Sequence, residues 1–171
     1  MNRWYCAYTK PRAELWARTN LWERGFEVYL PQYLKRRRHA RRTDYVAAPL
    51  FPRYLFVVAN LDAGVSRGIT YAPGVSNLIA FGGDPAPVPD AIIAELRAHE
   101  DDDGMMDIDR GRGIASRYQP GDKVRIAEGP MADSVGIVHA QTADQRVFIL
   151  LELLGRQVQV KVNARALSPE S

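Results

Sequence analysis

The segment best suited to bind a charged ligand is a run of cationic side chains at residues 35–42, with the sequence KRRRHARR. Six of its eight residues are Lys or Arg, and five of those six are Arg. Their mutual repulsion is relieved when each cation meets a phosphate and releases a counterion, and the planar guanidinium matches phosphate geometry. The run predicts binding to a nucleic-acid backbone with little sequence information. A solvated loop that only aids solubility is the alternative.

An apolar segment follows this basic run closely. In PRYLFVVANL, at residues 52–61, alternate residues of a strand would point to opposite faces of a sheet, and both sets are largely apolar. If helices cover only one face, Tyr54 and Phe56 are exposed on the other unless a partner or a second domain covers them. The alternative is that the first domain covers both faces itself.

The sequence contains no recognisable catalytic or metal-binding constellation. His39, His99 and His139 lie in different segments, without a His or Cys neighbour at metal-ligand spacing. Glycines and methionines interrupt the acidic residues at 100–109, which favours a solvated linker over a cation site. There is no glycine-rich phosphate loop and no nucleophile elbow. We therefore expect a binding protein, not an enzyme, that uses no metal and no cofactor.

Composition and charge indicate an ordinary folded protein whose basic residues lie early in the chain. Of the 171 residues, 46% are hydrophobic and 25% are charged. Residues 1–100 carry a net charge of +5, residues 101–117 a net charge of −2, and residues 118–171 none. No apolar run reaches the roughly 20 residues of a membrane span, and the N-terminus lacks the apolar segment of a signal peptide. With a single cysteine, Cys6, the chain suits a reducing cytoplasm.

The elements that position these segments predict an α+β domain, with helices on an antiparallel sheet. Strands are expected at residues 3–9, 26–33, 52–61 and 75–81. The basic run lies between the second and third strands, so it should form a loop or a hairpin tip.

Two helices are expected to pack on this sheet. The first covers residues 11–25 and is capped by Thr9, and the second is capped by Asp90. Leu15 and Trp22 fall on the outer side of the first helix, where they are either covered by another segment or form a partner-facing patch. The residues expected to face the core are Ala13, Ala17 and Leu21 in the first helix, and Ile92, Ile93 and Leu96 in the second.

The pattern changes after residue 100. Residues 101–117 are acidic and glycine-rich, which predicts a flexible linker. Residues 118–171 contain five short strand-like segments, which predict a small, partly closed barrel. Within it, VFILLELL at 147–154 is compatible with helix or strand, but QVQVKV at 157–162 alternates strictly. We therefore expect strands on both sides of Gly155 and a constitutive barrel instead of a helical hairpin.

Four segments resemble the NusG-type transcription elongation factors, and the resemblance covers nearly the whole chain in the expected order. WYCAYTKPRAE, PLFPRYLFV and PGVSNLIAFGGDPAPVPDAII are similar to the N-terminal (NGN) domain of that family. GDKVRIAEGPMADSVGIV is similar to the KOW motif that opens its C-terminal SH3-like barrel. The second and third segments look closer to the specialised RfaH branch than to housekeeping NusG. The resemblance implies an operon-specialised factor that suppresses pausing and opposes termination.

The resemblance also implies a set of contacts with bacterial RNA polymerase. An apolar cavity would bind the clamp helices of the β′ subunit, and its matching positions are Tyr8, Phe51, Pro52, Tyr54, Phe56 and Phe81, with Ile93 and Leu96 at the rim. Ser66 and Arg67 lie at the positions that reach the β-subunit gate loop. They depart from the polar HTTT-like stretch of the RfaH branch.

Nucleic acid and further proteins complete the partners that the resemblance implies. Upstream DNA or the non-template strand would meet Lys10, Arg12, Trp16, Arg18, Lys35, Arg36, Arg37, Arg38, Arg41 and Arg42. The barrel would contact the ribosomal protein NusE or Rho. In the RfaH branch an ion pair helps a helical C-terminal domain cover the polymerase site. Its two positions are Ala48 and Val138 here, so that pair cannot form.

A second function, from a different class, stays open at this point. KOW barrels also occur in ribosomal proteins, and the basic run suits RNA as well as DNA. The chain could therefore be an RNA-binding or ribosome-associated module that acts away from the polymerase.

Overall fold

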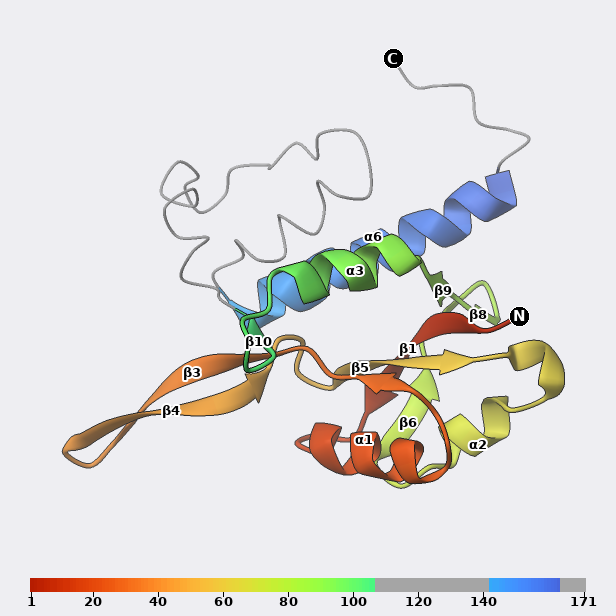
Figure 1. Ribbon diagram of the computed structural model, residues 1–171. Helices are drawn as coiled ribbons and strands as arrows, with labels where there is room; N and C mark the ends of the chain where they lie inside the picture. The colour runs from red at the N-terminus through yellow and green to blue at the C-terminus, as the bar shows by residue number, and fades with distance from the viewer. Residues whose placement is uncertain (107–141, 164–171) are drawn as a thin grey trace, which may run out of the picture.

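The computed structural model describes residues 1–106 and 142–163, and for residues 156–163 it describes the backbone alone. An antiparallel sheet lies at the centre, in the strand order β2-β5-β1-β6, and β9 also pairs with β1 (Figure 1). This arrangement confirms the expected α+β class. The strands are β1 (Arg3–Thr9), β2 (Val28–Tyr29), β5 (Tyr54–Ala59), β6 (Val75–Leu78) and β9 (Pro87–Val88).

Helices α1 (Glu14–Glu23) and α2 (Ser66–Thr70) cover one face of the sheet. The predicted stripe of Ala13, Ala17 and Leu21 is buried, as expected. Gly74 permits this packing, because a Cβ at its position would lie 3.0 Å from the backbone nitrogen of Ala17.

One expectation for the first helix is wrong. Thr9 is not its cap, because the helix begins at Glu14 after Ala13, without a side-chain cap, and the hydroxyl of Thr9 instead donates to the carbonyl of Lys10. Of the two alternatives for Leu15 and Trp22, the described part of the chain favours the uncovered one, since Trp22 is 71% exposed and Leu15 is also exposed.

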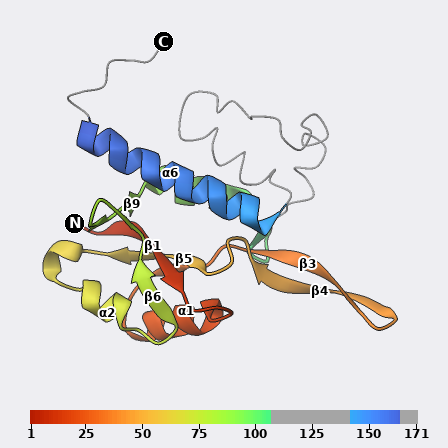
Figure 2. The same ribbon diagram turned by 180° about the vertical axis from the view of Figure 1, so that it is seen from behind.

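Helices α3 (Asp90–Ala98) and α6 (Ala143–Asn163) cover the opposite face of the sheet, where their buried side chains belong to one apolar cluster. Helix α3 lies in front of α6 in Figure 1 and behind it in Figure 2. The predicted inner face of α3 is confirmed, because Ile92, Ile93 and Leu96 are buried. Asp90 is the first residue of α3 and not its cap, which is Pro89. None of the helices in the described ranges is long and apolar enough to cross a membrane.

The prediction of strands on both sides of Gly155 is wrong, because the single helix α6 includes both segments. Its described side chains bury Leu150, Leu153 and Leu154 at helical spacing. A capping box begins the helix: the backbone nitrogen of Gln145 donates to the hydroxyl of Thr142 at 3.2 Å, and the backbone nitrogen of Thr142 donates to the side chain of Gln145 at 3.3 Å. The other strands of the predicted barrel, in residues 118–141 and 164–171, lie outside the described residues.

The basic run forms the tip of a long hairpin, one of the two predicted alternatives, and extends into its strands. Strand β3 (Gln32–His39) pairs with β4 (Arg42–Pro49) through a two-residue turn at Ala40 and Arg41, and the hairpin extends away from the body of the protein (Figure 1). The strand predicted at 26–33 is therefore divided between β2 and β3.

Two further segments differ from the predicted boundaries. β10 (Met105–Met106) pairs in parallel with β3, inside the segment expected to be linker, and residues 107–117 of that segment lie outside the described residues. The segment predicted as a strand at 75–81 is split into β6 and β7. The remaining elements are η1 (Leu61–Ala63), β7 (Ala80–Phe81) and β8 (Asp84–Pro85).

Candidate functional site

The largest apolar cluster lies between the sheet and the two helices α3 and α6. Phe51 and Phe56 are fully buried in it, with their ring centroids 6.2 Å apart in an edge-to-face arrangement. Tyr54 and Phe81 pack against it and are partly buried. We use the name apolar face for six members of this cluster, to which residues of α6 also belong: Phe51, Tyr54, Phe56, Phe81, Ile93 and Leu96.

Helix α6 contributes one side of this cluster. Leu150, Leu153 and Leu154 are buried in it, with Val147 and Ile149 partly buried beside them. The ring of Phe81 lies next to Gly155, because a Cβ at that glycine would be 3.5 Å from its Cε1 atom. A segment distant in sequence therefore occupies the surface that the aromatic strand presents.

Helix α3 is attached to the sheet independently of α6. The guanidinium of Arg97 lies 5.4 Å from the ring centroid of Trp4 and 4.9 Å from that of Tyr29. The hydroxyl of Tyr29 donates to the carboxylate of Glu100, which follows α3. Burial, with a smaller contribution from this hydrogen bond, raises the pKa of Tyr29, so its phenol stays protonated at neutral pH. The sheet and α3 therefore keep contacts that do not depend on α6.

A buried arginine anchors the first turn of α6. The Nε atom of Arg146 donates to the carbonyl of Leu50 at 2.8 Å, and its guanidinium lies 4.9 Å from the ring centroid of Tyr33. The ion pair of the RfaH branch cannot form here, since Ala48 carries no charge, and Val138 lies outside the described residues. Arg146 instead attaches α6 to Leu50, two residues after Ala48.

Replacing Arg146 by Met is expected to weaken the docking of α6, because the carbonyl of Leu50 loses its charged donor while the apolar volume is kept. A hydrogen bond to a charged group contributes roughly 1.5–3 kcal/mol. Amide hydrogen exchange of α6 in the full chain should accelerate by about 10- to 100-fold. Glu152→Gln, at an exposed position of the same helix, is the control and should leave exchange unchanged. Equal exchange in the two variants would contradict the anchoring role.

The structure places most of the proposed polymerase-binding residues together. Phe51, Phe56, Ile93 and Leu96 are buried in the cluster, and Tyr54 and Phe81 lie at its edge. Tyr8 lies beside Tyr54, with ring centroids 5.1 Å apart, while the guanidinium of Arg53 lies 4.1 Å from the ring centroid of Tyr8. Pro52 is exposed and outside the cluster.

The gate-loop positions lie on a different surface. Ser66 is half-buried at the start of α2 and Arg67 is exposed, on the side of the sheet that packs against α1. Lys10 and Arg12 are exposed in the turn before α1, with Arg12 at a φ of 60°. Trp16 is exposed on α1 and Arg18 is half-buried there.

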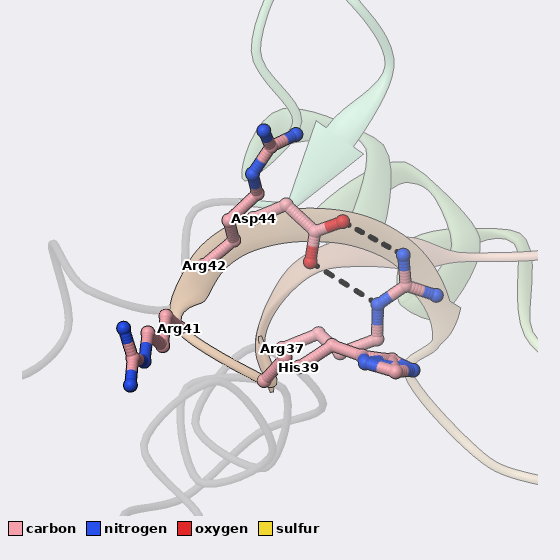
Figure 3. A pocket seen from close by; sticks show the side chains of 6 residues that line it. Arg37, His39, Arg41, Arg42 and Asp44 are labelled. Carbon is pink, nitrogen blue, oxygen red and sulfur yellow. Dashed lines mark hydrogen bonds and ion pairs between the residues drawn. The ribbon is translucent and has the colours of Figure 1, made fainter.

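The cations of the basic run all lie on the exposed hairpin. Arg37 forms two hydrogen bonds to the carboxylate of Asp44, at 3.1 and 2.7 Å, and this contact lowers the pKa of Asp44. An open hollow of about 560 Å³ lies at the turn end of the hairpin. Figure 3 shows the side chains of Arg41 and Arg42 extending away from the Arg37–Asp44 pair. The hollow is lined by Arg37, His39, Ala40, Arg41, Arg42 and Asp44.

The described residues offer no alternative centre for metal chemistry, because they contain no group of three or more His, Cys, Asp or Glu that could hold an ion. Cys6 is fully buried, and burial raises the pKa of its thiol. The two surfaces with distinct chemistry are therefore the apolar face and the basic hairpin.

Sequence analysis alone missed Arg146 and the leucines of α6 as part of this site. Two signals could have identified them: the spacing of Val147, Leu150 and Leu154, and the capping-box sequence from Thr142 to Gln145.

The family model and the curated relatives that match this chain carry the same family name. Residues 2–97 match the family model described as "Transcription termination factor nusG". A Thermus thermophilus protein named "Transcription termination/antitermination protein NusG" is 26% identical over an alignment 182 positions long, which covers 94% of each chain. A Staphylococcus carnosus protein of the same name is 25% identical over 170, covering 94% of this chain and 91% of its own. A solved structure titled "Domain interaction in Thermotoga maritima NusG" aligns at a TM-score of 0.39 and 23% identity, over 56% of this chain and 55% of that one.

Proposed function

The chain belongs to the NusG family of transcription factors, and from this premise we propose that it binds the β′ clamp helices of bacterial RNA polymerase through the apolar face. Members of this family are transcription factors and not enzymes. We infer an elongation and antitermination factor that suppresses pausing, acts in the cytoplasm and is specialised for particular operons in the manner of the RfaH branch.

The observation that carries this proposal is the way the apolar face is covered. On the other side of the sheet, α1 and α2 complete a core from residues close in sequence, whereas α6 covers the apolar face from beyond residue 142. An amphipathic helix that lies in an apolar groove can be replaced by a helix of a partner. Burying roughly 300–400 Å² of apolar surface contributes about 8–10 kcal/mol before the costs of association.

Binding to the polymerase therefore requires α6 to leave. The chain then exists in a covered and an open state, and only the open state binds. The apparent affinity of the chain for polymerase is therefore the affinity of the open state multiplied by the fraction of molecules that are open. The separate attachment of α3 to the sheet, through Arg97 and Tyr29, supports an apolar face that persists in the open state.

We infer the domain bounds and the other partners from the resemblance of the sequence to this family. Residues 1–100 form the polymerase-binding domain, residues 101–117 are the linker, and residues 118–171 recruit NusE or Rho once α6 has left the apolar face. Ser66 and Arg67 face the β-subunit gate loop. Lys10, Arg12, Trp16, Arg18 and the cations of the hairpin lie near upstream DNA or the non-template strand.

A transcription assay with purified core RNA polymerase tests this function. The full chain is compared with the variant Leu150→Asp/Leu154→Asp, in which α6 cannot dock, during single-round elongation through a strong pause. The variant should shorten the pause at lower protein concentration than the natural chain. If neither protein associates with the polymerase while both bind RNA, the proposal fails and the chain is an RNA-binding module that acts elsewhere.

A further inference from the structure

The two faces of the basic hairpin differ in chemistry, which the one-dimensional run of cations does not reveal. In the register of β3 and β4, Arg36 is opposite Tyr45, Arg37 is opposite Asp44, and Arg38 is opposite Thr43. Directly paired residues project from the same side of a ribbon, and successive residues alternate sides. One side therefore carries Leu34, Arg36, Arg38, Thr43, Tyr45 and Ala47, and we call it the tyrosine face. The other carries Lys35, Arg37, His39, Arg42, Asp44 and Val46, and we call it the acid face.

The tyrosine face combines an uncovered ring with cations that have no acidic partner. Tyr45 is 63% exposed, although a tyrosine is large enough to add apolar area to a core. Its Cβ lies about 5 Å from that of the opposite residue, Arg36, and Arg38 is its diagonal neighbour, within reach of a long side chain. The ion pairs among the described residues leave both of these arginines free.

The acid face has part of its charge neutralised within the hairpin. Asp44 holds Arg37 through the two hydrogen bonds seen in Figure 3. A polyanion that approached this face would meet a carboxylate whose pKa is lowered and which therefore stays ionised at neutral pH. Two exposed cations, Lys35 and Arg42, remain there and can be compared with Arg36 and Arg38 of the tyrosine face, which are also exposed.

We propose that the tyrosine face binds an unpaired DNA strand, in which the ring of Tyr45 stacks on a base while Arg36 and Arg38 contact phosphates on either side of it. Proteins that hold single strands combine cations that follow the backbone with aromatic rings that stack on bases. A duplex hides the faces of its bases in its own stack, so an exposed ring between cations gains more from an unpaired strand.

This inference rests on the proposed function for the choice of DNA. A factor bound to an elongating polymerase lies near a strand that transcription separates from its complement. The hairpin extends away from the apolar face and its covering helices, so it could reach such a strand without competing for the polymerase contact (Figure 1).

Oligonucleotide binding by the full chain tests the inference. Fluorescence anisotropy would compare a labelled oligothymidine, an oligouridine of the same length and a DNA duplex. Tyr45→Ala should weaken oligothymidine binding by about 5- to 150-fold, with the same dependence on salt, because it removes stacking and no charge. Tyr45→Phe, which keeps the ring, should bind as the natural chain does.

Two double variants that remove the same number of cations test whether the face on which the cations lie matters, or only their number. Arg36→Ala/Arg38→Ala and Lys35→Ala/Arg42→Ala each remove two cations from the same hairpin. The first should lose more affinity for oligothymidine and reduce the salt dependence more than the second. Equal losses in the two variants would show that only total charge matters, and would overturn the inference.

Three other results would also overturn it. These are unchanged binding by Tyr45→Ala, tighter binding of duplex than of oligothymidine, and preference for oligouridine with the same dependence on Tyr45. Polymerase binding by Tyr45→Ala is measured separately. If it is normal while oligothymidine binding is unchanged, the inference fails and the proposed function stands; if the natural chain does not bind polymerase, the proposed function fails whatever the oligonucleotides do.

Discussion

Replacing Leu150 and Leu154 by Asp is expected to raise the affinity of the full chain for core RNA polymerase by about 100-fold. Both side chains are fully buried in the cluster beneath α6. Deleting one buried leucine costs about 2–5 kcal/mol, and a carboxylate without a partner in the same place costs more. The docked state of α6 therefore loses its advantage, and the fraction of open molecules approaches one.

The matched control is Phe148→Asp. Phe148 lies on the same helix but is 65% exposed, so this single substitution places a negative charge on α6 while it removes little buried area. Its affinity for polymerase should stay at the natural value. Affinity is measured with immobilised core enzyme, and the release of α6 is followed by hydrogen exchange at α3 and β5. If the double variant binds no more tightly although α6 is released, the apolar face is not the polymerase contact.

Replacing Tyr54 and Phe81 by Ala in the released protein is expected to weaken polymerase binding by about 30- to 1,000-fold. These two rings lie at the edge of the apolar face, so an incoming helix would contact them directly. One aromatic residue in the centre of an interface commonly contributes roughly 2–4 kcal/mol to binding, and we expect about that total from these two rings because they lie at the edge of the face. Phe51 and Phe56 are unsuitable for this test, because they are fully buried and their removal would destabilise the domain itself.

The control for this variant is Tyr71→Ala, introduced into the same released protein. Tyr71 is 75% exposed and is not part of the apolar cluster. Its removal should leave polymerase binding unchanged, and circular dichroism should give similar melting temperatures for all the variants. Loss of binding in the Tyr71 variant, or normal binding by the variant without Tyr54 and Phe81, would exclude the apolar face as the contact surface.

These two results together define a switch between two uses of one surface. The leucines of α6 and the helices of a partner cannot occupy the apolar face at the same time. A variant that weakens docking should therefore strengthen polymerase binding, whereas a variant of the face itself should weaken both. Arg146→Met belongs to the first class, because its side chain contacts Leu50 and Tyr33 and not the edge residues Tyr54 and Phe81.

Much of the N-terminal fold was predictable because its signals are local. The spacing of Ala13, Ala17 and Leu21 identified the buried side of α1, and Ile92, Ile93 and Leu96 did the same for α3. Alternation in the segment around Tyr54 identified a strand with two apolar faces, and the structure buries Leu55 and Val57 on one side and Phe56 on the other. Boundaries were less accurate, since Pro52 and Arg53 form a turn before β5 begins.

The two faces of the hairpin could be assigned only once the register of its strands was known. In the sequence, the cations at 35–42 are a single run, and Asp44 and Tyr45 are adjacent polar residues. Pairing places Asp44 beside Arg37 and Tyr45 beside Arg36, on opposite sides of the ribbon. A turn one residue longer would change these partners, because side chains in a strand alternate from one face to the other.

By itself, the sequence determined the α+β domain, its aromatic strand and its concentration of positive charge, because each depends on residues that are close together in the chain. Only the tertiary structure decided the conformation of residues 143–163. The apolar run at 147–154 is compatible with a helix and with a strand, and the alternating residues 157–162 that follow it favoured a strand. The apolar face offers a groove that buries Leu150, Leu153 and Leu154 on one side of a helix, and contact with that distant surface outweighs the local preference.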